Sequence, residues 1–598
     1  MANGAETGMD GLRGRAELRL LPLFFTVFLV ALVVCLFDLA DARTFLGDVD
    51  DQMREIQIRR LMFGGGSWWD LGLPAVALPE PYVSPWSRLI DAPYVLIAWL
   101  LTPIFGAQKA LSLAFEIWPP LMLAVFSLEC AVIYRRTRVT ASLFGHVVVG
   151  SATVLMAFAL WEFVPGRIDH HNGQIVALMA IVCGLVRWDR VGGWLVGLGT
   201  LGAVAISLEG LPFIACVYAG LLTAMVLRAD GAALMLRRAS AILFLLSLPL
   251  AYGLLGPVGL LSVQCDAFSA PYIVLLTGLS AVLWGVSRLL PHAGWAAQAA
   301  ALVVPGAAVV GLFAFLFRQC LAGPYWMIDP LSKSHWLDRV GQEHSALYFI
   351  EQGQISIVAL AVILGSVLTF ASGALVRQRQ DGWPGLLIAL ITAWAALILT
   401  LVLNRYIRFA FAFAPLFVPI ATRFFLDGAT GKMTRRAAIV CVAAYIVVAG
   451  WIAVVTPVPM ARFDAADYMA FDTCSEGDFS ALAAQSPGRI AAPQGMGITL
   501  INGLPDGFSV AAIPFHRAAP GMKRMFEAFL SSDPAVRHLA LAPFDYVAIC
   551  RFPLKPDYGT APLYDALSAG DDWPGLMRLP NGAENPFQLF RIDHAALR

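Results

Sequence analysis

The chain has 598 residues, of which 59% are apolar and only 14% are charged. This apolar share lies well above the roughly 45–50% of an ordinary soluble domain, which excludes that class and indicates a polytopic membrane protein. The 41 basic and 41 acidic residues give a formal net charge of zero, so the charge balance offers no argument for a nucleic-acid partner.

The first apolar run, Leu20–Ala40, follows Arg13, Arg15 and Arg19. It is too long for the core of a signal peptide, and no convincing small-residue cleavage site follows it. We therefore expect residues 1–19 to be a cytoplasmic N-terminus and the run itself to be the first transmembrane helix.

Apolar runs of about 20 residues then alternate with short basic connectors. The connectors lie at 135–138, 187–190, 228–238, 287–292, 377–380 and 431–436. The positive-inside rule places all of them in the cytoplasm, and counting the crossings between them predicts about thirteen helices. That count requires residues 116–134 to span and residues 92–106, broken by Pro103 and Gly106, to be interfacial or re-entrant.

The composition changes after residue 456, where hydrophobic runs shorten and Pro, Gly, Asp and Ser become frequent. Alternating patches such as "DYVAICRF" indicate strands. An odd number of helices places this end of the chain outside the cytoplasm. We expect residues 20–456 to form the membrane domain and residues 457–598 to form a small extracytoplasmic α/β domain.

The nine cysteines contain no CxxC pair, which argues against a zinc ribbon or a redox motif. Five lie in apolar runs, where a cysteine is most often a small buried hydrophobic residue. The other four fall on the predicted outer side, where disulfides persist. We expect them to pair as Cys265 with Cys320 and Cys474 with Cys550.

Polar residues gather on the segments assigned to the outer side. They are Asp48, Asp50 and Asp51 in the first loop (41–115), Asp169, His170 and His171 in the second acidic loop (161–174), Glu343 and His344 in the long loop (319–352), and Arg405 and Arg408 at the end of helix twelve. A site for a divalent cation and a phosphate-bearing lipid needs such carboxylate, imidazole and guanidinium groups. Asp169 and His171, two residues apart, can point at one ion, and His170 would then face elsewhere.

Two further groups of residues have open roles. Trp68, Trp69, Tyr82 and Trp86 flank the interfacial segment, and they could stack on a sugar or form an aromatic belt, which is the commoner role. Glu209, in "ISLEGLP", is a carboxylate that either binds substrate or is structural.

In their order and sidedness these segments resemble the GT-C superfamily of polyprenyl-lipid-dependent glycosyltransferases, in particular the branch of oligosaccharyltransferase catalytic subunits. The resemblance covers about residues 20–456. It implies a fold of thirteen transmembrane helices with a C-terminal extracytoplasmic domain. It also implies a bacterial inner-membrane protein whose active site faces the periplasm.

The resemblance implies roles for individual residues. In "DDQMREIQIRRLM" Asp51, with Asp50 as the alternative, resembles the metal-binding Asp of the first loop, and Asp169 with His171 resembles the second acidic motif. Glu343 in "RVGQEH" resembles the Glu that reaches the metal and the acceptor, and Arg408, seven residues ahead of Pro415, resembles the Arg on the lipid-linked phosphate. Further candidates for substrate binding are Arg405, Arg88, Trp86, His344, His170 and Glu209.

The chain departs from protein N-glycosylating members in one respect, because no WWDYG-type motif follows residue 456. We expect transfer of a sugar or oligosaccharide from a polyprenyl-phosphate or diphosphate donor to a periplasmic glycan, lipid or protein, assisted by Mg²⁺, Mn²⁺ or Zn²⁺. One alternative is a secondary transporter or flippase of lipid-linked sugars, which predicts ionisable residues inside the spans and two related halves. The other is a metal-independent O-antigen polymerase or ligase, which would not need the acidic residues.

Overall fold

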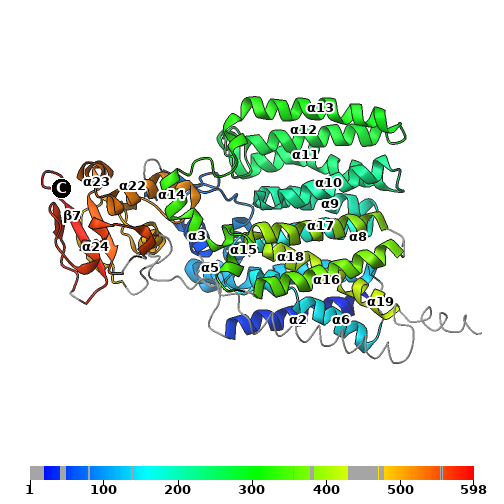
Figure 1. Cartoon of the computed structure of the whole chain (residues 1–598), viewed down its shortest axis with the longest axis horizontal. Helices are drawn as coiled ribbons and strands as arrows, with labels where there is room; N and C mark the ends of the chain where they lie inside the picture. Colours follow the sequence, from blue (N-terminus) through cyan, green and yellow to red (C-terminus); the bar gives the residue numbers. More distant parts are fainter. Residues whose placement is uncertain are drawn as a thin grey trace, which may run out of the picture. The chain divides into compact units, whose positions relative to one another are not determined.

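A computed structural model of the chain is shown in Figure 1. It describes residues 19–40, 49–77, 81–137, 139, 141–354, 356–377, 383–427, 469, 474, 477–552, 554, 556–582 and 584–597. Asp48, the connector at 431–436 and the expected thirteenth helix lie outside these ranges. The described residues form two compact units, one made of 19–40, 86–321 and 344–427, and the other made of 49–85, 322–343 and 469–597.

The first unit is a bundle of apolar helices, in which α11, α12 and α13 lie side by side (Figure 1). Its helices are α2 (Leu20–Ala40), α4 (Asp91–Phe105), α5 (Ala107–Arg136), α6 (Leu143–Val154), α7 (Ala157–Leu160), α8 (His171–Arg187), α9 (Arg190–Ile206), α10 (Leu211–Val226), α11 (Ala232–Gly259), α12 (Ala270–Leu289), α13 (Trp295–Leu316), α15 (Ala346–Glu351), α16 (Ser356–Arg377), α17 (Trp383–Val402), α18 (Ile407–Phe413) and α19 (Val418–Asp427).

Within the described residues, nine helical segments are long and apolar enough to cross a membrane. The number becomes ten if α6 and the segment Ala157–Phe163, bent by 63° from it, form one span. The apolar helices α8 and α9 are shorter, with 17 residues each. The predicted class, a multi-pass helical membrane protein, is confirmed.

The run at 92–106 forms α4, which has 15 residues and is not among the nine long segments. It ends because Gly106 takes a φ of +75°, a conformation that only glycine adopts without strain. The next helix, α5, has 30 residues and contains the predicted crossing at 116–134. By length and composition α5 can cross a membrane and α4 is shorter than a typical span, while the interfacial position of α4 stays a prediction.

Close packing between α8 and α9 depends on small residues. Gly184 faces Gly192, and a Cβ added at Gly184 would lie 2.8 Å from Cγ2 of Val196. Such stripes let membrane helices approach closely without a side chain between them. Asp189 begins α9, where its Oδ1 accepts a hydrogen bond of 2.7 Å from the Gly192 amide. This cap fixes the turn between α8 and α9, which lies at the end of α8 remote from the "DHH" segment.

The second unit is built on one seven-stranded sheet with the order β2-β1-β4-β3-β5-β7-β6. Its strands are β1 (Gly72–Ala77), β2 (Pro81–Val83), β3 (Arg489–Ala491), β4 (Ser509–Val510), β5 (Tyr546–Cys550), β6 (Leu576–Arg578) and β7 (Phe587–Ile592). Its helices are α3 (Val49–Phe63), α14 (Pro330–His335), α21 (Gly497–Gly503), α22 (Ala519–Leu530), α23 (Pro534–Leu541) and α24 (Pro562–Ala569).

The strand expected in "DYVAICRF" is β5, and all five of its residues are buried. The sheet also contains two strands from the first loop, since β1 pairs with β4 in parallel through Val76 and Val510. This pairing joins residues that are far apart in the sequence. The α/β domain expected at 457–598 is thus completed by residues of the first loop.

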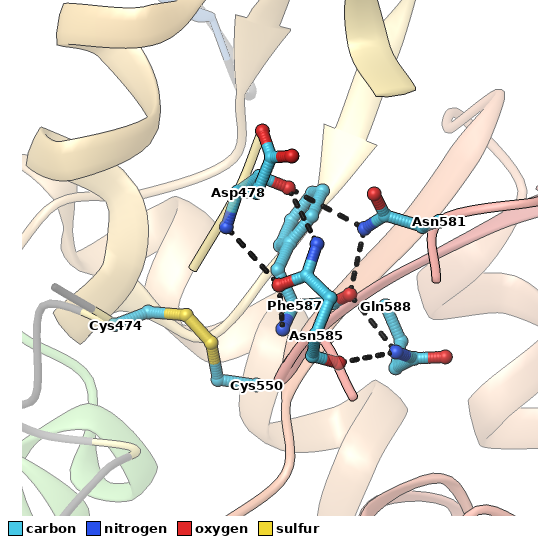
Figure 2. Close-up of a disulfide and its surroundings, with 7 residues drawn as sticks. All are labelled: Cys474, Asp478, Cys550, Asn581, Asn585, Phe587 and Gln588. Atoms are coloured by element: carbon cyan, nitrogen blue, oxygen red, sulfur yellow. Dashed lines mark hydrogen bonds between the residues drawn. A yellow bond between two sulfur atoms is a disulfide. The ribbon is translucent and has the colours of Figure 1, made fainter. Parts of the chain in front are cut away.

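Both expected disulfides are present, Cys265–Cys320 and Cys474–Cys550. Figure 2 shows the second, which joins the segment around Asp478 to the end of β5. The amide of Asp478 donates to Oδ1 of Asn585 at 3.0 Å, and Nδ2 of Asn585 donates to the Asp478 carbonyl at 2.8 Å. The disulfide therefore attaches this segment to β5, and the hydrogen bonds attach it to the residues just before β7.

Candidate active site

The loop that leads into α8 is held in place by backbone contacts. It follows the 3₁₀ turn η1 (Trp161–Phe163) and turns at Gly166, whose φ is +85°. The Gly166 amide donates to the carbonyl of Phe115 on α5 at 3.2 Å. Nδ2 of Asn172 donates to the Arg167 carbonyl at 3.3 Å. These bonds fix the segment that carries Asp169.

Asp169, His170 and His171 form a buried cluster at the start of α8. Oδ1 of Asp169 lies 2.5 Å from Nδ1 of His170, and its Oδ2 lies 3.2 Å from Nε2 of His171. The expectation that His170 faces elsewhere is wrong. Neighbouring side chains point to opposite faces only in extended backbone, and His170 has helical angles, φ −72° and ψ −13°.

Opposing effects act on the pKa of the buried Asp169 carboxyl. Burial raises its pKa, but the His170 and His171 rings and the Arg167 guanidinium together outweigh burial, so the pKa lies well below its ordinary value. A carboxylate beside two imidazoles is a combination of groups that can bind a metal ion. One ligand atom from each of the three residues lies within 4.8 Å of the others.

One distance within the cluster fits two ligands of a divalent ion. Two ligand atoms bound at about 2.1 Å in a tetrahedral site lie about 3.4 Å apart, and in an octahedral site they lie about 3.0 Å apart. The distance of 3.2 Å from Oδ2 of Asp169 to Nε2 of His171 falls between these values. Imidazole nitrogen favours Zn²⁺ or another transition ion over Mg²⁺, which prefers oxygen ligands.

A network of ion pairs surrounds the cluster. Oε2 of Glu162 accepts a hydrogen bond of 2.8 Å from Nη2 of Arg167, and its Oε1 forms an ion pair with Nη1 of Arg408 at 3.1 Å. Glu209, beside His171, has its Oε1 3.7 Å from Nη1 of Arg405. The three arginines and the three carboxylates, Asp169 included, sum to a formal charge of zero. Mutual pairing of this kind makes buried charge tolerable.

The network brings together predicted residues from remote segments and adds two that were not predicted. Arg405 lies in η6 (Asn404–Tyr406), Arg408 lies on α18, and Glu209 lies in η2 (Leu208–Gly210). The unpredicted members are Glu162 and Arg167. The signal for both was in the sequence, because charged residues next to apolar membrane segments are costly and usually functional.

Three other candidates also lie in the first unit. The ring of Trp86 lies 5.5 Å from that of His170, so this tryptophan contacts the cluster. The carbonyl of His344 accepts from the amide of Asn404 at 2.9 Å, which places His344 beside the segment of Arg405. Arg88 forms a buried ion pair of 2.8 Å with Asp91.

The remaining candidates belong to the second unit. Asp50 and Asp51 lie in the first turn of α3, and Asp51 is buried. Glu343 lies in η5 (Gly341–Glu343), where its Oε1 is 3.5 Å from the hydroxyl of Tyr325. Negative charge is favourable in the first turn of a helix, which contributes to the position of the two aspartates.

The fold and this cluster define a multi-pass helical membrane protein with an α/β unit and a buried site that fits a divalent cation. No family model matches the chain, and no curated protein matches it. Solved structures of an oligosaccharyltransferase from the archaeon Archaeoglobus fulgidus do share its fold.

The structure of that enzyme, AglB, with an inhibitory peptide and a dolichol-phosphate has a TM-score of 0.60 at 15% identity, covering 88% of this chain and 69% of that chain. The structure tethered to an acceptor peptide with the NVT sequon has a TM-score of 0.56 at 14% identity, covering 94% and 74%. The complex with Zn and sulfate has a TM-score of 0.55 at 13% identity, covering 92% and 72%. The expected fold class, a multi-span membrane protein with a C-terminal part that contains a sheet, is confirmed, whereas the number of thirteen helices and the side of the membrane stay predictions.

Proposed function

We propose that this protein is a membrane glycosyltransferase of the GT-C type, which transfers a sugar or oligosaccharide from a polyprenyl-phosphate or diphosphate donor to a glycan, lipid or protein acceptor. The observation that supports it most is the buried Asp169–His171 cluster. It is linked through Arg167 and Glu162 to Arg408, and through Glu209 to Arg405. The similar archaeal enzyme was solved with a dolichol-phosphate and, separately, with Zn and sulfate.

The charges in the site suit an anionic donor. The network of three arginines and three carboxylates is neutral by itself. A divalent ion would add two positive charges to a buried site, and a lipid phosphate would neutralise them. When bound by Asp169 and His171, the ion would act as a Lewis acid on the phosphate oxygens.

Arg408 and Arg405 are proposed to bind the donor phosphate. Arg408 is only 8% exposed and is oriented by Glu162. A guanidinium held in this way needs little reorganisation to stabilise the negative charge that develops on the departing phosphate. Stabilisation of the leaving group is the main chemical demand of sugar transfer from a lipid phosphate.

The sequence resemblance suggests further roles for residues of the second unit. Asp51, with Asp50 as the alternative, and Glu343 are proposed as further metal ligands. Glu343 or Asp50 would also accept the proton of an acceptor hydroxyl. Trp86, Arg88, His170 and His344 are proposed to bind the donor or the acceptor. The missing WWDYG-type motif favours an acceptor other than a protein sequon, and the site is proposed to face the periplasm of a bacterial inner membrane.

The test uses the purified full-length protein in lipid nanodiscs and a short-chain polyprenyl diphosphate that carries a labelled sugar. Release of the sugar from the lipid is measured with and without EDTA, and for Asp169→Asn and Arg408→Ala. Asp189→Asn is the matched control, because it changes an aspartate at the other end of α8. We expect loss of release with EDTA and in both site variants but not in the control.

Two outcomes would contradict the proposal. Release that survives both EDTA and Asp169→Asn would exclude the metal-dependent mechanism and favour a metal-independent polymerase or ligase. Movement of the intact glycolipid across a bilayer without cleavage of the sugar–phosphate bond would instead identify a flippase.

A further inference from the structure

The side chain of His171 has two ring nitrogens that face different partners. Nε2 lies 3.2 Å from Oδ2 of Asp169, on the side of the proposed metal. Nδ1 lies 3.7 Å from Oε2 of Glu209. Neither Nδ1 of His171 nor Oε2 of Glu209 has a hydrogen-bond partner among the described residues, and both atoms are buried. A buried donor and a buried acceptor that face each other in this way are costly unless they bond.

The position of Glu209 opposite His171 is built into the backbone. Glu209 lies in η2, and η2 begins directly after Ser207. The Ser207 carbonyl accepts a hydrogen bond from Nε2 of Gln174 at 3.3 Å. Gln174 lies within the first turn of α8, which begins at His171. One side-chain hydrogen bond therefore ties η2 to the turn that carries the histidine.

We propose that Glu209 is a positioning residue that accepts a hydrogen bond from Nδ1 of His171 and so leaves Nε2 unprotonated for the metal. A neutral imidazole carries one proton, and the bond made by one nitrogen decides which nitrogen can bind a metal. Metal-binding histidines commonly have a carboxylate in this place, and its loss weakens metal binding. The inference rests on the proposed function, in which His171 is a metal ligand.

The same carboxylate also contacts the phosphate side of the site. Its other oxygen, Oε1, lies 3.7 Å from Nη1 of Arg405. Glu209 thus connects a proposed metal ligand with a proposed phosphate ligand. Glu162 is the matched comparison, since it is also a carboxylate that binds arginines of this network, but its recorded partners are Arg167 and Arg408.

The test is a titration of metal-free, full-length protein with ZnCl₂ by calorimetry, and it needs no substrate. We expect Glu209→Gln to weaken Zn²⁺ binding by about 10–100-fold, the usual effect of losing such a carboxylate. Glu162→Gln removes the same charge from the network and should weaken binding by less than about 3-fold, because distance and pairing reduce the purely electrostatic effect. Thermal unfolding of each metal-free variant checks that it is folded.

A double-mutant cycle separates positioning from a structural role. If Glu209 acts through His171, then Glu209→Gln should change Zn²⁺ affinity little in a His171→Ala background. An effect that persists there, or equal losses for Glu209→Gln and Glu162→Gln, would overturn the inference. If Glu209→Gln does not fold, Glu209→Asp is titrated in its place and should also bind Zn²⁺ more weakly, because its carboxylate is drawn back from His171.

The outcomes distinguish this inference from the proposed function. If the wild-type protein binds no Zn²⁺, the inference fails together with the metal-dependent mechanism. If the wild type binds Zn²⁺ and Glu209→Gln binds it equally well, only the role of Glu209 is wrong.

Discussion

Arg408 on α18 and Glu162 in η1 form an ion pair, with 3.1 Å between Nη1 and Oε1, although they are far apart in the sequence. The second carboxylate oxygen of Glu162 binds Arg167 at 2.8 Å. One buried glutamate therefore connects the helix of the proposed phosphate ligand with the loop of the proposed metal ligands. Under the proposed function, this arrangement would hold the donor phosphate beside Arg408.

The first prediction concerns Arg408. Arg408→Ala should lower the rate of sugar release from the labelled polyprenyl diphosphate by at least about 100-fold, because it removes a preorganised positive charge from the leaving group. Arg408→Lys should restore only part of the rate, since lysine lacks the planar fork that binds two oxygens at once. Rates are measured under single-turnover conditions.

Arg423 provides the control for this series. Its Nη2 donates to the carbonyl of Thr137 at 2.6 Å, outside the network around Asp169. Arg423→Lys should leave the rate within about 2-fold of wild type, since lysine keeps the positive charge and can still donate a hydrogen bond to this carbonyl. Equal losses in the Arg408 and Arg423 variants would show that the rate reports stability rather than phosphate binding.

The second prediction tests the close packing of α8 against α9. Gly184→Ala should destabilise the protein by about 1–3 kcal/mol, because the new Cβ would lie 2.8 Å from Cγ2 of Val196 and 2.9 Å from its backbone nitrogen. The measurement is the thermal unfolding midpoint in detergent. Gly202→Ala on α9 is the control, since its Cβ would lie 3.6 Å from that of Ala177, an ordinary contact. A stabilised Gly184→Ala would contradict the packing described here.

The third prediction concerns the disulfide between Cys474 and Cys550, which are 76 residues apart in the sequence. Cys474→Ser should lower the free energy of unfolding of the α/β unit by about 2–4 kcal/mol, because closing a long loop restricts the unfolded chain. The measurement is chemical unfolding followed by tryptophan fluorescence. Cys216→Ser, at a free cysteine on α10, should leave the midpoint unchanged. A wild-type protein whose unfolding is insensitive to a reducing agent would argue against the disulfide.

The fourth prediction is a pH dependence at Asp189. Partial burial raises its pKa, but hydrogen bonds from Arg187 and from the Gly192 amide, with attraction to Arg187 and Arg136, bring the pKa below its ordinary value. Because the folded pKa is the lower one, the ionised carboxyl stabilises the protein above about pH 4, and this contribution is lost as the pH falls through the folded pKa.

Two variants separate the parts of this effect. Asp189→Ala should cost about 1 kcal/mol near neutral pH, since it removes the helix cap. Asp189→Asn keeps a capping side chain and should cost less than about 0.5 kcal/mol, because the ion pair with Arg187 is partly exposed. The gap between wild type and Asp189→Asn in unfolding midpoint should close in acid. A gap that widens in acid would reverse the sign argued here.

Much of the architecture was predictable from local patterns. Apolar runs and basic connectors indicated the multi-pass helical class, and the side assigned to each loop led to both disulfide pairs. The strand β5 was visible as an alternating patch. These features depend on residues that are near one another in the sequence, or on the side of the membrane on which a segment lies. The spacing of apolar and basic residues along the chain indicates both.

The pairing partners were decided by the tertiary structure. Burial makes each charged group require a counter-charge, but the sequence does not say which one, so Glu162 became the partner of Arg408 only once α18 packed near η1. In the same way β1 joined β4 because an open sheet edge pairs with whichever strand lies beside it. Composition and motif order thus indicated the class of protein and the kinds of side chain in the site, whereas long-range packing chose the contacts of Arg408 and of Glu209.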